Sequence, residues 1–186
     1  MAEICGIDEA GRGCIAGPLC VAGCVLHAQI SGLNDSKKLS EKKREELFEK
    51  IVKNSNFKIV EFSSANVDEM GLSACLKSAL EEIVAHFGEQ NFDIIFDGNS
   101  KFGASGFRTM VKADAKIAEV SAASILAKVT RDRKMREIAK ACPQYGFAKN
   151  KGYGAKAHIE AIKKFGYTEF HRKSYHLKAL EKSLFD

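Results

Sequence analysis

The sequence lacks the features that direct a chain into or across a membrane. No apolar run approaches the roughly 20 residues that a membrane-spanning helix needs. The N-terminal residues M-A-E-I-C do not form a basic segment followed by an apolar signal region. The six cysteines include no C-x-x-C pair, which disfavours both a zinc site and a disulfide framework. We therefore expect a cytoplasmic protein with free thiols and no insertion into a membrane.

The sequence also lacks the motifs of two large enzyme classes. It has no G-x-S-x-G turn, which would carry a serine nucleophile. It has no G-x-x-x-x-G-K-[ST] loop, which would hold the phosphates of a nucleoside triphosphate. A serine hydrolase and a GTPase or ATPase of the P-loop type are therefore disfavoured. Internal repeats and low-complexity tracts are absent too.

The first 140 residues have no net charge. They contain 20 basic and 20 acidic side chains, whereas residues 141–186 contain nine basic and four acidic ones. The net charge of +5 therefore lies entirely in the last quarter of the chain. This asymmetry suggests a polyanionic partner, although a basic face that merely contacts solvent would have the same composition.

The sequence does contain enough apolar residues for one domain of ordinary size, since 45% of its 186 residues are hydrophobic. Hydrophobic periodicity predicts strands over 3–8, 18–27, 57–62, 92–96 and 107–112. It predicts helices over 41–53, 72–87, 116–141, 155–165 and 174–184. This order predicts an α/β core over residues 1–142, in which a mixed sheet of about five strands is flanked by helices. Residues 143–186 are expected to form a basic helical region that packs on the core.

Adjacent carboxylates, Asp8 and Glu9, end the first predicted strand. Two neighbouring acids repel one another unless a cation lies between them, so the pair suggests ligands for a hard divalent cation. The alternative is two exposed acids that merely end a strand. Gly11 and Gly13 allow successive backbone N–H groups to turn towards an anion, and Arg12 between them can contact phosphate oxygens. Acids for a metal beside donors for a phosphate indicate phosphodiester chemistry.

Two further aspartates are placed where a metal site would need them. Asp97 ends a buried strand before Gly98, and Asp114 precedes the longest predicted helix. If the strand of Asp97 runs parallel to the first strand, the acids at the two strand ends converge. A turn-forming Asp-Gly pair and a helix N-cap are the alternatives for the two residues. Four acids on three elements suit a mechanism that uses two divalent cations.

Other acids near these positions are less suitable. Asp93 begins its strand, away from the predicted site, and Glu119 lies within the long helix. Asp132 lies beside Arg131 and Arg133, which favours a salt bridge.

Five motifs occur in the order found in one known family, and together they span nearly the whole chain. They are D-E-A-G-R-G at 8–13, D-S-K-K-L at 35–39, F-D-G at 96–98, K-A-D at 112–114 followed by S-A-A-S-I-L-A-K-V-T-R-D at 121–132, and K-G-Y-G at 151–154 with H-R-K-S at 171–174. In these motifs the chain resembles ribonuclease HII, the type 2 ribonuclease H. The resemblance implies a ribonuclease H-like fold.

The resemblance implies an endonuclease that uses Mg²⁺ or Mn²⁺, two cations during catalysis. Its substrates would be RNA–DNA hybrids and duplex DNA with single embedded ribonucleotides, cut on the 5′ side to leave 3′-hydroxyl and 5′-phosphate ends. The implied metal ligands are Asp8, Glu9, Asp97 and Asp114. The implied sensor of the ribose 2′-hydroxyl is the Gly11–Gly13 turn, and that of the following deoxyribose is Tyr153.

Several residues have both a structural and a functional interpretation. Tyr153 could instead be a half-buried aromatic residue in a loop. His158 and His171 are better interpreted as structural histidines. The candidates for phosphate contact are Lys37, Lys38, Lys151 and Arg172.

The alternatives in function are another two-metal nuclease of the same fold, such as a junction resolvase, and a nucleic-acid-binding module without catalysis. We expect a monomer. Ser183-Leu184-Phe185 faintly resembles the C-terminal peptides that bind sliding clamps, without their usual glutamine.

Overall fold

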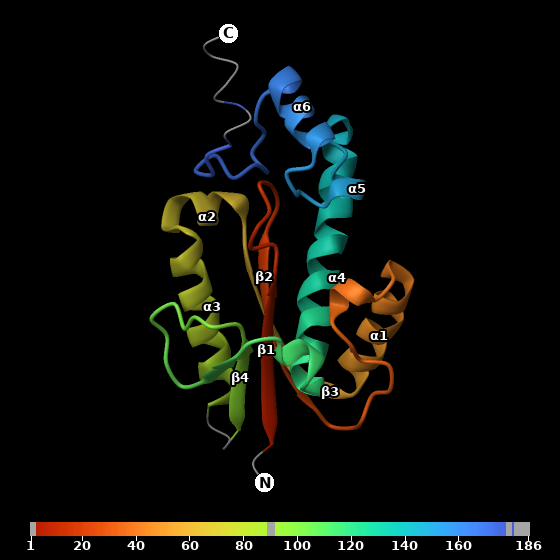
Figure 1. Cartoon of the computed structure of the whole chain (residues 1–186), viewed down its shortest axis with the longest axis vertical. Helices are drawn as coiled ribbons and strands as arrows, with labels where there is room; N and C mark the ends of the chain where they lie inside the picture. The colour runs from red at the N-terminus through yellow and green to blue at the C-terminus, as the bar shows by residue number, and fades with distance from the viewer. Residues whose placement is uncertain (1–2, 89–91, 178–179, 181–186) are drawn as a thin grey trace.

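The structure, a computed structural model, describes residues 3–88, 92–177 and 180. Its centre is a five-stranded sheet in the order β3-β2-β1-β4-β5 (Figure 1). The strands are β1 (Ile4–Ala10), β2 (Leu19–Leu26), β3 (Ser55–Phe62), β4 (Asp93–Asp97) and β5 (Arg108–Met110). β1, β2 and β3 pair antiparallel, whereas β4 lies parallel to both β1 and β5. The predicted mixed α/β sheet is therefore confirmed.

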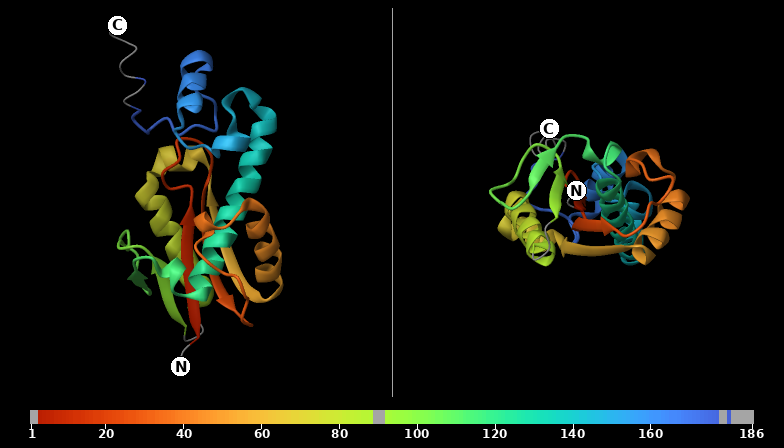
Figure 2. Two further views of the ribbon diagram at one scale, coloured as in Figure 1. Left: turned by 45° about the vertical axis from the view of Figure 1, so that its right-hand side comes forward. Right: turned by 90° about the horizontal axis from the view of Figure 1, so that it is seen from below.

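Helices cover both faces of the sheet, as the view from below in Figure 2 shows. α3 (Leu72–Phe87) packs on one face, and α1 (Glu41–Lys53) and α4 (Ala118–Ala141) pack on the other. Side chains alternate along β1, so that Cys5 and Ile7 contact the α3 layer while Ala10 contacts the α4 layer. The almost continuous apolar run of β2 follows from this double cover.

The N-terminal boundaries of two helices depend on serine caps. Ser40 caps α1 as predicted, its Oγ accepting a hydrogen bond from the Lys43 backbone N–H. Ser63 caps α2 (Ser64–Met70), a helix that the prediction missed. Ser63 and Asn66 complete a capping box, and Gly71 at φ +83° separates α2 from α3.

Gly6 allows α4 to approach the centre of β1. A Cβ atom at Gly6 would overlap the backbone of Glu119 and Val120 in the first turn of α4. The start of α4 therefore lies directly against the middle strand, and the short 3₁₀ turn η2 (Ala113–Ala115) before it contacts α4 and β4.

The C-terminal region packs at one end of the sheet, at the top of Figure 1. It contains η3 (Pro143–Tyr145), α5 (Phe147–Asn150) and α6 (Lys156–Phe165). An apolar cluster joins it to the core through Ile15 and Met135. α6 confirms the helix predicted over 155–165, but residues 174–177 form a turn and irregular structure where the next helix was expected to begin. Most of that predicted helix lies outside the described residues. Among the helices described, none is both long and apolar enough to span a bilayer.

Candidate active site

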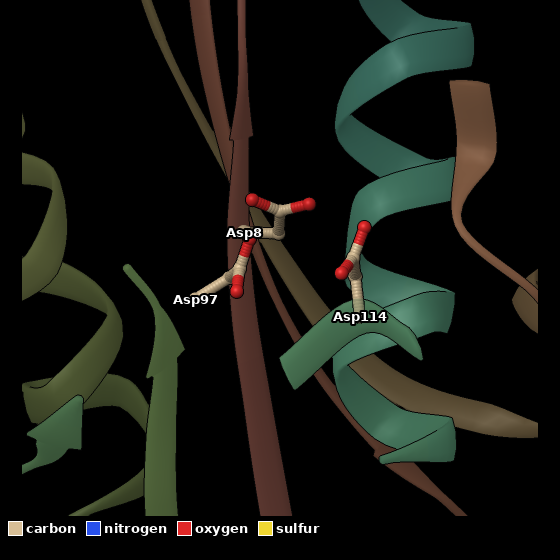
Figure 3. A group of neighbouring side chains, drawn as sticks. All are labelled: Asp8, Asp97 and Asp114. Carbon is tan, nitrogen blue, oxygen red and sulfur yellow. The ribbon is translucent and has the colours of Figure 1, made fainter. Parts of the chain in front are cut away.

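Three aspartates from separate elements converge beside the middle strand. The parallel register of β1 and β4 ends with Ile7 beside Phe96, so that Asp8 and Asp97 follow at neighbouring positions. η2 contributes Asp114 from the start of the α4 layer. One carboxylate oxygen from each of the three lies within 4.8 Å of the others (Figure 3). The predicted convergence of the acids is therefore found.

Local hydrogen bonds hold Asp97 and Asp114 in place. Asp97 Oδ1 accepts a hydrogen bond of 2.8 Å from the Ala113 backbone N–H, which fastens η2 to the end of β4. Asp114 is not the N-cap of α4, since that position belongs to Ile117. The chain also bends directly after Asp97, where Gly98 has φ +131°. The turn interpretation and the metal-ligand interpretation of Asp97 are thus compatible.

The acids of this site are electrostatically unfavourable without a cation. Burial raises the pKa of Asp8 well above its ordinary value, and the charge of Glu9 raises it further. Burial also raises the pKa of Asp114, with a smaller contribution from Asp97. These shifts have the sign expected when several carboxylates share one desolvated site.

Glu9 is the fourth acid, although it is not one of the three converging aspartates. Burial raises the pKa of Glu9, and Arg12, 3.7 Å away, opposes the rise. Within the described residues, Glu9 Oε2 is a buried side-chain oxygen without a hydrogen-bond partner. A divalent cation would supply the missing positive charge and a partner for this oxygen, so the donor set fits Mg²⁺ or Mn²⁺.

The rival acids have other partners or other positions. Asp93 forms an ion pair with Arg108 at 2.7 Å. Asp132 does form a salt bridge, but with Lys128 at 2.7 Å and Arg44 at 3.8 Å instead of the neighbouring arginines. Lys128 lies one helical turn before Asp132 and therefore on the same face of α4, whereas the side chains of adjacent residues point apart. Glu119 lies outside the group of three aspartates.

The Gly11–Gly13 turn follows β1 and forms a wall of the site. Gly11 has φ +98°, and a Cβ atom there would overlap the side chain of Arg131. Arg131 is fully buried and donates to the carbonyl oxygens of Pro18, Ala16 and Lys151. This arginine therefore joins the turn to the C-terminal region.

Sequence reasoning did not identify the role of Arg131. The one available signal is its spacing, four residues after the buried Ala127 of α4.

Arg172 has a similar structural position, which argues against its predicted phosphate contact. It is 1% exposed, and its guanidinium donates to the carbonyl oxygens of Gly17 and Arg12. Its donors are therefore directed at the backbone of the β1–β2 connection. The sequence could not show this, because the acceptors lie about 155 residues away in the chain.

Tyr153 lines the same cleft as Asp8 and Glu9. The backbone N–H groups of Ile15 and Ala16 both donate to Gly152 O, so the segment before Tyr153 is bonded to the connection after the Gly11–Gly13 turn. The Tyr153 side chain remains 45% exposed. The cleft has a volume of about 400 Å³, and its lining includes Asp8, Glu9, the Gly11–Gly13 turn, Ser36, Lys37, Ser124, Lys128 and Tyr153.

The D-S-K-K motif forms the rim of the cleft next to α4. Asp35 accepts a hydrogen bond from the Lys37 N–H, and Ser36 Oγ lies 2.8 Å from Ser124 Oγ. Ser124 also bonds to the Asp8 carboxylate and lowers its pKa. Lys37 and Lys38 are exposed. Lys151 is mostly buried, with its Nζ 3.9 Å from Glu41.

Comparisons with known proteins agree with this geometry. The sequence profile of the family Ribonuclease HII matches residues 5–178. Ribonuclease HII of Campylobacter hominis is 68% identical over 179 residues, covering 96% of this chain and 97% of the relative. Ribonuclease HII of Campylobacter concisus is 63% identical over 178 residues, with 96% and 95% covered. The structure of the PCNA:RNase HII complex from Archaeoglobus fulgidus matches with a TM-score of 0.80 and 29% identity, covering 95% of this chain and 96% of that one.

Proposed function

This chain belongs to the ribonuclease HII family and is a metal-dependent ribonuclease H acting on RNA in RNA–DNA hybrids, and from that premise we propose that it also incises duplex DNA at single embedded ribonucleotides. The cut lies on the 5′ side of the ribonucleotide and leaves 3′-hydroxyl and 5′-phosphate ends. The observation that carries the proposal is that Asp8 and Glu9 line one cleft with the Gly11–Gly13 turn and Tyr153, while Asp97 and Asp114 converge on Asp8.

In this proposal the residues that hold Mg²⁺ or Mn²⁺ are Asp8, Glu9, Asp97 and Asp114. A pair of divalent cations, when bound, stabilises the attacking and leaving oxygens of an in-line displacement at phosphorus. The protein's own contribution is to hold the carboxylates in a desolvated site and to place the scissile phosphate against them. No side-chain nucleophile is required.

The walls of the cleft recognise the two sugars that follow the cut, the ribose and the deoxyribose after it. Backbone groups of Gly11, Arg12 and Gly13 contact the ribose 2′-hydroxyl, which both donates and accepts hydrogen bonds. The exposed ring of Tyr153 lies against the following deoxyribose, where an additional hydroxyl would be crowded. Lys37, which lines the cleft, and the neighbouring Lys38 bind phosphates of the same strand.

The proposal also includes contacts between the duplex and residues outside the cleft. We assign a supporting contact with the duplex to the basic C-terminal region. Lys151 is a weaker candidate, since it is already close to Glu41. Arg172 is left out, because its guanidinium is buried on backbone carbonyls. In this proposal the protein acts as a monomer in the cytoplasm.

A contact with a sliding clamp is a further part of the proposal. The structure of the Archaeoglobus fulgidus relative is a complex of RNase HII with PCNA. The peptide Ser183-Leu184-Phe185 lies outside the described residues of this chain. A pull-down with the clamp tests the contact, using a chain truncated after Lys182 as the control.

The experiment that tests the proposed function is cleavage of a labelled duplex with one ribonucleotide, with Mg²⁺ and with a chelator. We expect one Mg²⁺-dependent nick on the 5′ side of the ribonucleotide and no cut in the all-DNA duplex. Cleavage of a branched all-DNA substrate instead would support a resolvase. Binding without any cleavage would support a non-catalytic module.

A further inference from the structure

Behind Tyr153 lies a buried pair of histidines that the proposed chemistry does not use. His158 belongs to the first turn of α6, and His171 lies in the segment after that helix. They are 0% and 1% exposed, and their Nε2 atoms are 3.1 Å apart. At this distance one nitrogen must donate a hydrogen to the other.

The contacts of His171 determine which nitrogen is the donor. The backbone N–H of Thr168 donates to His171 Nδ1 over 2.9 Å, so Nδ1 is unprotonated. A neutral His171 therefore carries its hydrogen on Nε2 and donates it to His158. His158 must then accept at Nε2 and carry its own hydrogen on Nδ1. Nδ1 of His158 lies 2.8 Å from Tyr153 O, where it donates.

The four groups thus form a chain of hydrogen bonds with a single direction, from the Thr168 N–H through both imidazoles to the carbonyl of Tyr153. The titratable side chains that face the pair are Tyr145 and Tyr167, whose rings pack on His171, and Lys173, whose charge acts on it. The ring of Phe147 packs on both histidines. Adding a proton to either imidazole would place two N–H groups opposite each other, so the chain requires both to be neutral.

The Tyr153 side chain has few partners, the Arg131 guanidinium 6.0 Å from the centre of its ring and the Cys14 side chain, which hydrogen-bonds with it. Tyr153 lies between Gly152 and Gly154, which have no side chains to pack, and its own ring is 45% exposed. Besides these two side-chain contacts, the position of the ring depends on backbone hydrogen bonds. These are the bond from the Tyr153 N–H to Asn150 O, the bond from the Ala155 N–H to Tyr153 O, and the bond from His158.

We infer that His158 is a positioning residue for substrate recognition, because its Nδ1–H holds the Tyr153 carbonyl and thereby the ring at the wall of the cleft. His171 acts through His158 by fixing the hydrogen on Nδ1, a task that an asparagine amide at position 158 does not need. The inference rests on the proposed role of Tyr153 at the ribose–deoxyribose junction. It adds a functional task to two residues that would otherwise be purely structural.

Two substitutions of His158 separate its two hydrogen bonds. In His158→Asn the amide nitrogen replaces Nδ1 and can still donate to Tyr153 O. In His158→Gln the amide replaces Nε2, which keeps contact with His171 but loses the bond to Tyr153 O. Both variants remove the aromatic ring, so the loss of packing is shared and each serves as the control for the other.

The measurement is kcat/KM on a duplex with one ribonucleotide divided by kcat/KM on a long RNA–DNA hybrid. His158→Gln should lower this ratio by about fivefold, the effect of one hydrogen bond, and His158→Asn should change it by less than about twofold. In a Tyr153→Ala background, His158→Gln should leave the ratio unchanged. Equal losses in the two single variants, or the same loss without the tyrosine ring, would overturn the inference.

A second readout keeps the inference testable if Tyr153 does not recognise the junction. In that case Tyr153→Ala leaves the ratio unchanged, and the proposed recognition fails by itself. Hydrogen exchange of the Ala155 amide, which donates to the same Tyr153 carbonyl, then tests whether His158 holds that carbonyl in place. Faster exchange in His158→Gln than in His158→Asn supports the inference, and equal exchange in the two variants contradicts it.

Discussion

At the scale of single residues, the site combines carboxylates that destabilise the fold when no cation is bound. Asp8 is 7% exposed and has a raised pKa, because it is buried and lies next to Glu9. A carboxyl group whose pKa is raised by folding stabilises the protein while it is protonated. That contribution is lost as the pH rises through the raised pKa, and above that pKa the ionised group is unfavourable.

We predict that Asp8→Asn and Asp97→Asn separately lower the cleavage rate by at least about a hundredfold, since each removes a charge from a site that stabilises the transition state by several kcal/mol. Without divalent ions, Asp8→Asn should raise the free energy of unfolding at pH 7. The measurements are single-turnover cleavage and denaturant unfolding with a chelator. Asp93→Asn, which removes only the exposed pair with Arg108, is the control and should cleave normally. Normal turnover in both site variants would exclude these residues as metal ligands.

The sequence predicts the acids of the site better than it predicts the arginines. Asp8 and Asp97 could be identified because acids towards the carboxyl ends of neighbouring parallel strands lie side by side, although β1 continues past Asp8 to Ala10. Arg131 and Arg172 could not, because each is buried on carbonyl groups from distant segments that only the complete fold brings within reach. For this reason the sequence predicts a phosphate contact for Arg172, whereas in the structure its guanidinium bonds backbone carbonyls.

At the scale of secondary-structure elements, α4 and the β1–β2 connection organise the cleft. α4 lies against β1 through the missing side chain of Gly6, and its Arg131 holds the turn after β1. The strands and the long helices could be predicted because apolar periodicity is strong where an element is buried. α2 was missed because its seven residues give too short a pattern, and because its N-terminal signal is an asparagine capping box instead of the usual glutamate or glutamine.

The two glycines of the turn should differ in their tolerance of a side chain. Gly11→Ala should lower the free energy of unfolding by roughly 1–3 kcal/mol, because φ is +98° and the new Cβ overlaps Arg131. At Gly13 a Cβ atom would meet nothing within 4 Å, so Gly13→Ala should change stability by less than about 0.5 kcal/mol. Urea unfolding of both variants checks this prediction. Equal destabilisation would mean that Arg131 does not pack beneath the turn.

At the scale of the whole molecule, the neutral core contains the acids and the C-terminal region contains the excess positive charge. α6 presents Lys163 and Lys164 in its last turn, at the end of the molecule where the Tyr153 segment also lies (Figure 2). Lys163 is also 3.2 Å from Glu160, but the pair is largely exposed and therefore weak. This arrangement agrees with a duplex that extends from the cleft across the C-terminal region.

We predict that replacing Lys163 and Lys164 by alanine weakens binding to all duplexes alike. The slope of log affinity against log salt should become shallower by roughly one unit per lost phosphate contact, because fewer counterions are released. Fluorescence anisotropy across a salt series measures the slope. The same double replacement at Lys50 and Lys53, in the last turn of α1, is the control. If the two double variants have the same slope as the unchanged protein, the α6 lysines merely contact solvent.

The central claim is that a single cleft both recognises and cuts at a ribonucleotide followed by deoxyribose. Its most direct test is the cleavage efficiency of Tyr153→Ala on a duplex with one embedded ribonucleotide, divided by its efficiency on a long RNA–DNA hybrid. The division removes general damage to the metal site. The predicted result is a ratio well below that of the unchanged protein, with Tyr153→Phe close to normal apart from one hydrogen bond of about 1 kcal/mol. Equal losses of Tyr153→Ala on both substrates would contradict the claim.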